Sequence, residues 1–361
     1  MAFEVNEDLF KQLWPYILDD NVTDIKWNGS NLWITDLNKG RYLEDSINLD
    51  EEWLNIFTGV IANSVNENFN LSKPTLMAET KELRIQAEHG SIAGDNRTCV
   101  AIRKTPSYSR LAHKDLVKEG YASEYVLKLL PCLMRARLSG IITGDVGSGK
   151  TELEKYLCSF IPDQDPIVTV EDTLEMKLKS LYPEKDIFSM KISDNFHEED
   201  AIKDALRLNT KWLIISESRG RDIARIMEGA SSGCVALTSI HCENVWEVPD
   251  RIINMAGNEG NSNLENDIYT FFDYAIKVKA DYSAKGIKRS IDQICFFDRV
   301  NKRNLIFTLM KDGKVLNEFL PDRIFKKFLD NKEKDFLQLY TEKLKNENIK
   351  LIQCQKIKGN N

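Results

Sequence analysis

The eight residues GDVGSGKT, from 144 to 151, constrain the fold of this chain more than any other segment. They match the pattern G-x-x-x-x-G-K-T, in which glycines allow successive backbone N–H groups to converge on phosphate oxygens. The pattern carries this meaning only between a strand and a helix. Residues 141–143 predict a short apolar strand, and an apolar stripe at helical spacing follows the loop, formed by Leu153, Tyr156, Leu157, Phe160 and Ile161. The sequence therefore predicts a phosphate-binding loop at a helix N-terminus and not a plain glycine-rich turn.

We expect every residue of this loop to take part in binding a nucleoside triphosphate. The Lys150 ammonium should reach the β- and γ-phosphates, and the Thr151 hydroxyl should bind Mg²⁺. The expected nucleotide-binding residues are Gly144, Asp145, Val146, Gly147, Ser148, Gly149, Lys150 and Thr151.

The pattern of strands and helices predicts two domains. The chain has 361 residues, of which 42% are hydrophobic and 29% charged, as in a globular protein. We expect a smaller α+β N-terminal domain over residues 1–103, a linker over 104–118, a P-loop (RecA-like) α/β domain with a mostly parallel sheet over 119–320, and a helical tail over 321–361. No internal repeat is present.

Within the first domain, residues 22–35 predict a β-hairpin around the Asn28-Gly29 turn, and Asp50 can cap a helix. Two further strands lie in KELRIQAEHG and RTCVAIRK. Beyond the linker the strand candidates are 141–143, 167–170, 212–215 and 234–239, and residues 274–297 predict an antiparallel ribbon.

Charge and cysteine content exclude several classes of protein. The net charge of −7 argues against broad binding to a nucleic-acid backbone. The seven cysteines occur singly with no C-x-x-C pair, so a structural zinc is not expected and a reducing compartment is. No apolar run is long and uninterrupted enough to cross a bilayer. We expect a cytoplasmic chain whose basic tail packs as helices on the core, in preference to a membrane or partner contact.

Polar side chains follow three of the predicted strands at the point where each one ends. Glu171 follows IVTV, Glu217 follows WLIIS, and His241 follows LTSI. Taken singly, each is typical of a solvated loop acid or a structural histidine. Because ligands of open parallel sheets gather beyond the carboxyl ends of the strands, their recurrence there indicates a metal-dependent triphosphate site.

With these residues in place, the sequence resembles the secretion or traffic ATPases of type IV and type II secretion systems and type IV pili. Four boxes occur in the family's order: GDVGSGKT, VTVEDTLE, ALRLNTKWLIISESRG and LTSIHCEN. The likeness extends to NVTDIKWNG and CVAIRK in the first domain and is strongest to the type IV secretion and tight-adherence pilus branch. Ser216 stands where the family usually has glycine before its Walker B glutamate.

The resemblance implies roles for the site residues. Glu171 would polarise the attacking water, assisted or replaced by Glu217, and Glu217 would reach Mg²⁺ together with Thr151. His241 would sense the γ-phosphate. Four arginines match family positions that contact phosphate or a subunit interface, with an ordinary surface salt bridge as the alternative for each: Arg84, Arg103, Arg207 and Arg219.

It also implies the activity: hydrolysis of ATP with Mg²⁺, in a homohexamer, with nucleotide bound between the two domains. The motor would serve translocation or conjugation machinery at the inner face of the cytoplasmic membrane. The alternatives are an assembly motor for a type IV pilus or type II secretion system, a DNA or RNA motor, a small-molecule kinase, and a scaffold that binds ATP without hydrolysing it.

Overall fold

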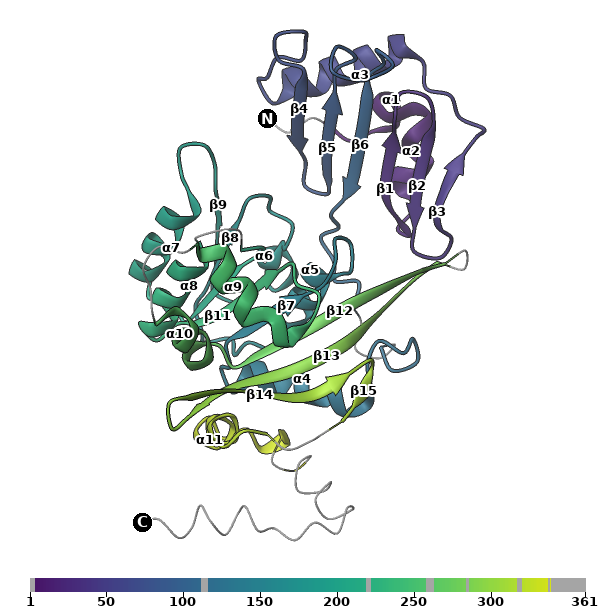
Figure 1. Cartoon of the computed structure of the whole chain (residues 1–361). Helices are drawn as coiled ribbons and strands as arrows, with labels where there is room; N and C mark the ends of the chain where they lie inside the picture. The colour runs from purple at the N-terminus through teal and green to yellow at the C-terminus, as the bar shows by residue number, and fades with distance from the viewer. Residues whose placement is uncertain are drawn as a thin grey trace. The chain divides into compact units, whose positions relative to one another are not determined.

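The computed structural model describes residues 4–111, 116–218, 222–257, 263–283, 286–316, 320–336 and 338. The chain divides into two compact units, of which the first comprises Met1–Tyr108 and Ala280–Lys288 and the second comprises Ser109–Lys279 and Arg289–Asn361. The division falls within the expected linker, of which residues 112–115 lie outside the described residues. The segment Ala280–Lys288, at the far end of the ribbon formed by β12 (Tyr274–Ser283) and β13 (Gly286–Val300), is also part of the first unit, which the sequence did not predict (Figure 1).

The first unit is built on a six-stranded antiparallel sheet in the order β3-β2-β1-β6-β5-β4. Its strands are β1 (Val22–Trp27), β2 (Leu32–Asp36), β3 (Gly40–Glu44), β4 (Thr75–Glu79), β5 (Leu83–Glu88) and β6 (Cys99–Lys104). The helices are α1 (Glu7–Phe10), η1 (Lys11–Leu13), α2 (Trp14–Leu18) and α3 (Glu51–Ser64).

Local sequence signals set these elements. Asn28 Oδ1 accepts from the backbone N–H of Asn31 at 2.8 Å, and Gly29 takes φ +94° in the turn between β1 and β2. Asp50 caps α3 by accepting from Trp53 N at 3.2 Å. The predicted hairpin, helix and pair of strands are thus confirmed, and their apolar faces share one core with α1 and α2.

The second unit contains a nine-stranded mixed sheet in the order β15-β14-β13-β12-β7-β11-β10-β8-β9. The six strands from β12 to β9 are parallel, and β13 to β15 continue the sheet in antiparallel fashion. The strands are β7 (Gly140–Thr143), β8 (Ile167–Glu171), β9 (Ile187–Lys191), β10 (Trp212–Ile215), β11 (Val235–Ile240), β12 (Tyr274–Ser283), β13 (Gly286–Val300), β14 (Arg303–Lys311) and β15 (Lys314–Val315). All the strands predicted from the sequence are present.

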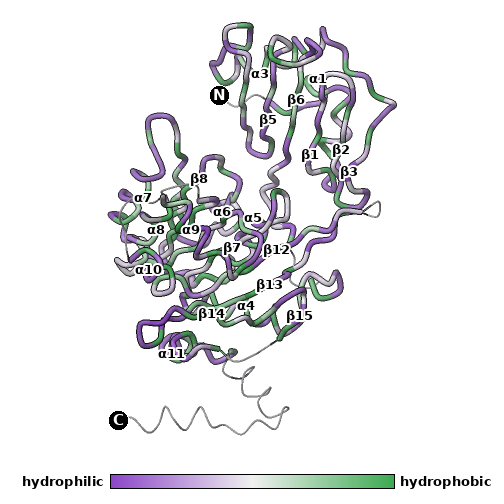
Figure 2. The backbone as a smooth tube through the Cα atoms, in the orientation of Figure 1, coloured by the Kyte–Doolittle hydropathy of each residue, from purple (hydrophilic) through white to green (hydrophobic). Residues whose placement is uncertain are grey.

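Helices cover both faces of this sheet because its strands are apolar on both faces. Trp212 and Ile214 pack with α4 (Glu124–Arg135), α5 (Lys150–Cys158), α6 (Leu178–Leu181) and α11 (Asp322–Asp330). Leu213 and Ile215 pack on the opposite face with α7 (Glu198–Arg207), α8 (Asp222–Ser231), α9 (Val248–Ala256), after η2 (Val245–Glu247), and α10 (Leu264–Phe271). Figure 2 shows apolar segments along the central strands and hydrophilic residues in the outer loops.

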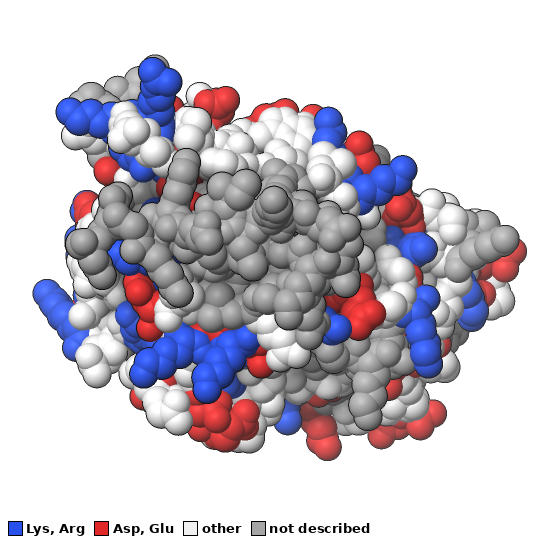
Figure 3. All heavy atoms as spheres, turned by 90° about the horizontal axis from the view of Figure 1, so that it is seen from below, with Lys and Arg blue, Asp and Glu red and all other residues white. Residues whose placement is uncertain are grey.

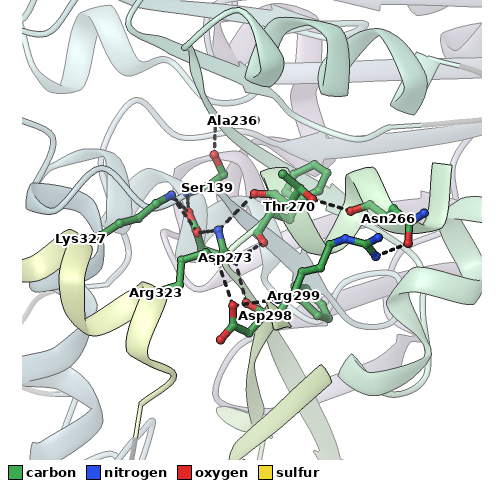
Figure 4. Close-up of polar contacts among 11 residues, drawn as sticks. Ser139, Ala236, Asn266, Thr270, Asp273, Asp298, Arg299, Arg323 and Lys327 are labelled. Atoms are coloured by element: carbon green, nitrogen blue, oxygen red, sulfur yellow. Dashed lines mark hydrogen bonds and ion pairs between the residues drawn. The ribbon is translucent and has the colours of Figure 1, made fainter. Parts of the chain in front are cut away.

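A buried carboxylate fastens α11 to the sheet (Figure 4). Asp273, which is fully buried, precedes β12 and accepts from the N–H of Ser139 at 2.7 Å. Arg323 and Lys327 of α11 contact the same carboxylate at 2.7 Å each. Arg323 Nη2 also donates to the Phe297 carbonyl of β13 at 2.7 Å. The part of the tail that the structure describes thus packs on the core, as expected, through ion pairs as well as apolar contacts with Ile324 and Phe328.

On the face shown in Figure 3, basic and acidic side chains lie interspersed. Among the described residues, no helix combines the length and apolar composition needed to cross a bilayer.

Asp273→Ala should lower the free energy of unfolding of the second unit by about 3 kcal/mol, because it leaves two cations and the Ser139 N–H without their buried partner. Chemical denaturation followed by tryptophan fluorescence measures this loss. Asp204→Ala is the control, since Asp204 pairs with a 79% exposed Arg207 side chain; its effect should stay within about 1 kcal/mol. Equal effects for the two variants would contradict the importance of the Asp273 cluster.

Candidate functional site

The candidate site lies where four adjacent parallel strands, β7, β11, β10 and β8, end at one edge of the sheet. The register aligns Thr143 with Ile240 and Ile215 with both Thr238 and Val170. The residues that follow these strands therefore emerge side by side. This places the glycine-rich loop, His241, Glu217 and Glu171 along a single edge.

The loop from 144 to 149 has glycine at two positions where a larger residue would be strained. Gly144 has φ +146°, and a Cβ there would lie 2.3 Å from the Val278 carbonyl oxygen. Gly149 has φ +100° and directly precedes α5, whose first residue is Lys150. Within the loop the N–H of Ser148 donates to the Asp145 carbonyl at 3.2 Å, which closes a turn. The backbone thus curls around the N-terminus of α5, as an anion-binding loop requires.

The ammonium group of Lys150 folds back over this loop. Its Nζ donates to the carbonyl oxygens of Gly144 at 2.8 Å and Asp145 at 3.1 Å. Burial lowers the pKa of Lys150 below its usual value, while the charges of Glu217, Glu154 and Asp145 oppose that shift. A partly buried cation held by neutral carbonyls is well placed to bind an anion.

His241 connects Lys150 to Glu217. Its Nε2 lies 2.8 Å from Glu217 Oε1, and its Nδ1 lies 3.3 Å from Lys150 Nζ and 3.1 Å from the Gly144 carbonyl oxygen. Thr143 Oγ1 donates to the Cys242 carbonyl at 2.7 Å and holds the histidine segment against β7. Three polar residues from three different segments therefore form one continuous chain of contacts.

The segment that carries Glu217 is bonded to its neighbours on both sides. Ser216 N donates to the Val170 carbonyl at 3.3 Å, and the Ser216 carbonyl accepts from the Ser239 hydroxyl. Ser218 bonds to the Thr238 hydroxyl at 2.6 Å. Ser216 is thus accommodated in place of the family's usual glycine, with its backbone extending the sheet by one residue.

Glu171 is only 2% exposed and is bonded within its own segment. Its Oε2 accepts from Met176 N at 2.9 Å, and Thr169 Oγ1 donates to Oε1 at 3.3 Å. Burial raises the pKa of Glu171 to about 7, although these hydrogen bonds lower it in part. A carboxylate with this pKa can gain or lose a proton near neutral pH.

Glu154 is a residue of the site that the sequence interpretation missed. It is fully buried on α5, one helical turn after Lys150, with the Ser239 hydroxyl beside its carboxyl group. Burial raises its pKa well above the usual value, although the charge of Lys150 and the Ser239 hydroxyl lower it in part. Its i, i+4 spacing from Lys150, beside the apolar stripe at Leu153 and Leu157, is the signal that could have found it.

The structure places the four predicted arginines differently. Arg207 is an exposed side chain paired with Asp204 at 3.1 Å, in keeping with the surface alternative. Arg84 and Arg103 are opposite one another on β5 and β6 of the first unit, and Arg103 contacts Asp24 at 2.9 Å. Arg219 lies outside the described residues. Phosphate-binding roles for these arginines stay predictions.

The residues present fit a magnesium nucleotide. A Cβ at Gly144 would fill the loop, and the buried Ser148 Oγ has no hydrogen-bond partner among the described residues. The hydroxyl of Thr151 and the carboxylate of Glu217 are oxygen donors of the kind Mg²⁺ prefers. No group of three His, Cys, Asp or Glu side chains arranged to hold a metal occurs in the described ranges.

Comparisons with solved structures define the class of fold. The Yersinia pseudotuberculosis ATPase DotB matches with a TM-score of 0.62 at 16% identity, over 84% of this chain and 81% of that one. The pilus retraction motor PilT, solved with bound ADP, matches with a TM-score of 0.58 at 13% identity, over 94% of this chain and 90% of that one. The fold is therefore that of these α/β secretion and pilus ATPases.

Sequence comparisons define the family. The model of the type II/IV secretion system protein family matches residues 75–295, which is more than half of the chain. An uncharacterised Bacillus anthracis protein is 29% identical over 75% of this chain and 63% of its own length. The type IV secretion system protein VirB11 of Bartonella henselae is 26% identical over 47% of this chain and 51% of its own length. The chain thus spans between half and two thirds of these two relatives, and it belongs to the type II/IV secretion system protein family, as the motifs indicated.

Glu171→Gln should make the second unit less sensitive to pH. The pKa of Glu171 is raised from 4.5 to about 7 in the folded state. Between these two values the carboxyl group is ionised in the unfolded chain but still protonated in the folded one, so the wild type loses stability as the pH rises. The variant's free energy of unfolding, relative to wild type, should rise by about 3 kcal/mol between about pH 4.5 and about pH 8. Denaturation across this range measures the difference.

Glu184→Gln, which removes an exposed carboxylate, is the control and should parallel the wild type. A Glu171→Gln curve that also parallels the wild type would show that the buried carboxyl group is not the source of the pH dependence.

Proposed function

We propose that the protein is a P-loop, RecA-like ATPase that hydrolyses ATP with Mg²⁺ in a type IV secretion-like system. The observation that carries the proposal is the chain of contacts from Lys150 through His241 to Glu217, at the strand ends beside the glycine-rich loop. Membership of the secretion family and the fold shared with DotB and PilT support it.

The loop would bind the phosphates through its backbone N–H groups and the N-terminus of α5. Lys150 now donates to two carbonyls, and those bonds can be exchanged for bonds to phosphate oxygens at little cost. Mg²⁺, when bound, would neutralise charge on the β- and γ-phosphate oxygens, with Thr151 and Glu217 as its protein contacts. His241, which touches both Lys150 and Glu217, would respond to the terminal phosphate.

Two carboxylates could orient the attacking water. Glu217 is 26% exposed, and its Oε1 contacts His241 next to Lys150. Glu171 has a pKa of about 7 that suits a general base near neutral pH, but its oxygens are occupied by Met176 and Thr169. We therefore assign the main role at the water to Glu217 and a proton-accepting role to Glu171, whose hydrogen bonds must exchange for it to act.

The finer role is part of the proposal and rests on the resemblance of the sequence to the secretion ATPases. The chain would act as a homohexamer, with nucleotide between its two units and Arg84 and Arg103 directed to phosphate. It would associate with inner-membrane secretion components on the cytoplasmic side. Loss of the γ-phosphate would release contacts in each subunit, which is a common type of conformational switch. A pilus or type II secretion assembly motor is the second candidate, because PilT shares this fold.

Three variants test hydrolysis at this site. Lys150→Ala should weaken ATP binding at least about tenfold, because a charge-assisted contact to phosphate is lost. Glu217→Gln should keep ATP affinity while turnover falls about 100-fold, since a group that acts on the attacking water is lost. Glu171→Gln should also reduce turnover. Phosphate release and binding of a fluorescent ATP analogue measure both quantities, with Glu184→Gln as the exposed control.

Equal turnover in the wild type, Lys150→Ala and Glu171→Gln would exclude hydrolysis at this site and leave a nucleotide-binding scaffold. Phosphate recovered on an acceptor molecule would instead identify a kinase. Strong stimulation by added DNA would identify a nucleic-acid motor, whereas a rate unaffected by DNA is expected.

A further inference from the structure

We propose that Arg289 is a positioning residue of the nucleotide site, and that it couples the phosphate loop to the described residues at the end of the β12–β13 ribbon, Ser283 and Gly286–Lys288, called the ribbon tip below. The inference rests on the proposed function, because it concerns the same loop. Arg289 belongs to none of the four sequence boxes and lies on β13, an antiparallel extension of the sheet.

The guanidinium group of Arg289 donates two hydrogen bonds to the backbone of the phosphate loop. Its Nε and Nη2 donate to the Gly147 carbonyl oxygen at 3.3 Å and 3.2 Å. The next N–H, that of Ser148, belongs to the same planar peptide group and donates to the Asp145 carbonyl at 3.2 Å. This peptide plane is therefore held at both ends. Its orientation decides where the N–H groups of the loop point, and hence whether the loop is ready for phosphate.

The side chain of Arg289 also explains a second glycine. A Cβ at Gly149 would lie 3.0 Å from Arg289 Cδ, so the arginine packs directly against the residue that precedes Lys150. Gly149 has φ +100°, a conformation in which a larger residue would be strained in any case. Contact with both Gly147 and Gly149 means that the loop cannot move outward without displacing the guanidinium group.

The strand that carries Arg289 passes directly into the ribbon tip. Strand β13 begins at Gly286, and its first three residues belong to the first unit. The second unit resumes at the next residue, Arg289. Ile287, two residues before Arg289, donates its N–H to the Leu37 carbonyl at 2.9 Å, in the turn between β2 and β3. Ile291, two residues after it, donates to the Tyr121 carbonyl at 2.7 Å. Because the backbone of a strand is already extended, it cannot lengthen to absorb a displacement, so a movement of Ile287 also moves Arg289.

The ribbon tip and the turn between β2 and β3 are in close contact, so a substitution in the turn can displace the tip. A Cβ at Gly40 would lie 2.6 Å from the Ser283 carbonyl oxygen, and one at Gly286 would lie 2.5 Å from that of Leu37. A single methyl group at Gly40 therefore pushes the tip away from the turn, and neither partner is a residue of the nucleotide site.

The first arm of the test measures affinity for a fluorescent ADP analogue and steady-state ATP turnover. Arg289→Gln should raise the dissociation constant and KM about tenfold with kcat within about twofold of the wild type, because the loop is less often in its binding conformation. Arg289→Lys should recover part of the affinity, since an ammonium can still donate to the Gly147 carbonyl. Lys288→Gln, which removes the same charge from the exposed neighbouring residue, should match the wild type.

The second arm is a double-mutant cycle. Gly40→Ala should weaken binding in the wild-type background and have no further effect in the Arg289→Gln background. Gly313→Ala is its control: Gly313 has φ +72°, close to the +74° of Gly40, but a Cβ there meets nothing within 4 Å. The control carries the same backbone strain without the collision and should leave affinity unchanged.

Each outcome decides the matter. Wild-type affinity for Arg289→Gln, or a loss of thermal stability without loss of affinity, would overturn the positioning role. Additive effects of Gly40→Ala and Arg289→Gln would overturn the coupling. Failure of the proposed function is separate: the wild type itself would then not bind the nucleotide, or Lys150→Ala would bind it as well as the wild type does.

Discussion

The second unit depends on one constraint, the parallel pairing of β7, β11, β10 and β8 with apolar residues on both faces. A strand buried on both sides can expose polar groups only at its ends, and parallel pairing brings all the carboxyl ends to one edge. The same apolar residues that bury Trp212 and Leu213 on opposite faces thus also force Glu217 and His241 to meet. Core packing and the composition of the site are consequences of the same pairing.

The polar groups at that edge differ in how deeply they are buried and in how easily their contacts can be replaced by a ligand. Lys150, His241 and Glu217 contact one another or backbone carbonyls, and such contacts exchange readily for a ligand. Glu171 and Glu154 are buried behind them, where burial raises the pKa of each. An anionic ligand is thus met first by a cation and hydrogen-bond donors. Of the three carboxyl groups, only that of Glu217 lies with them, and burial favours the protonated, neutral form of the other two.

Much of this arrangement could be read from the sequence, because its signals are local. The glycines of 144–149, the short apolar strands and the acid or histidine after each strand specify the edge of the sheet. What could not be read depends on distant pairing. Arg289 meets Gly147 across 142 positions of sequence, and Arg323 meets Asp273 across 50. Neither pair has a spacing rule. Glu154 was missed for another reason: a helix pattern assigns an acidic residue to the outside, and tertiary packing buried it.

The division of the chain has a consequence for biosynthesis. The first unit includes residues 280–288, and the carboxylate of Asp273 in the second unit finds its cations only on α11, at positions 323 and 327. Because a ribosome delivers the chain from the N-terminus, the first unit cannot complete its packing until residues 280–288 have emerged, and Asp273 has no cation partner until α11 has emerged. The second unit therefore matures after the first, and nascent chains halted before α11 would already contain every residue of the nucleotide site while Asp273, at the other end of β7 and β12, lacked its cations.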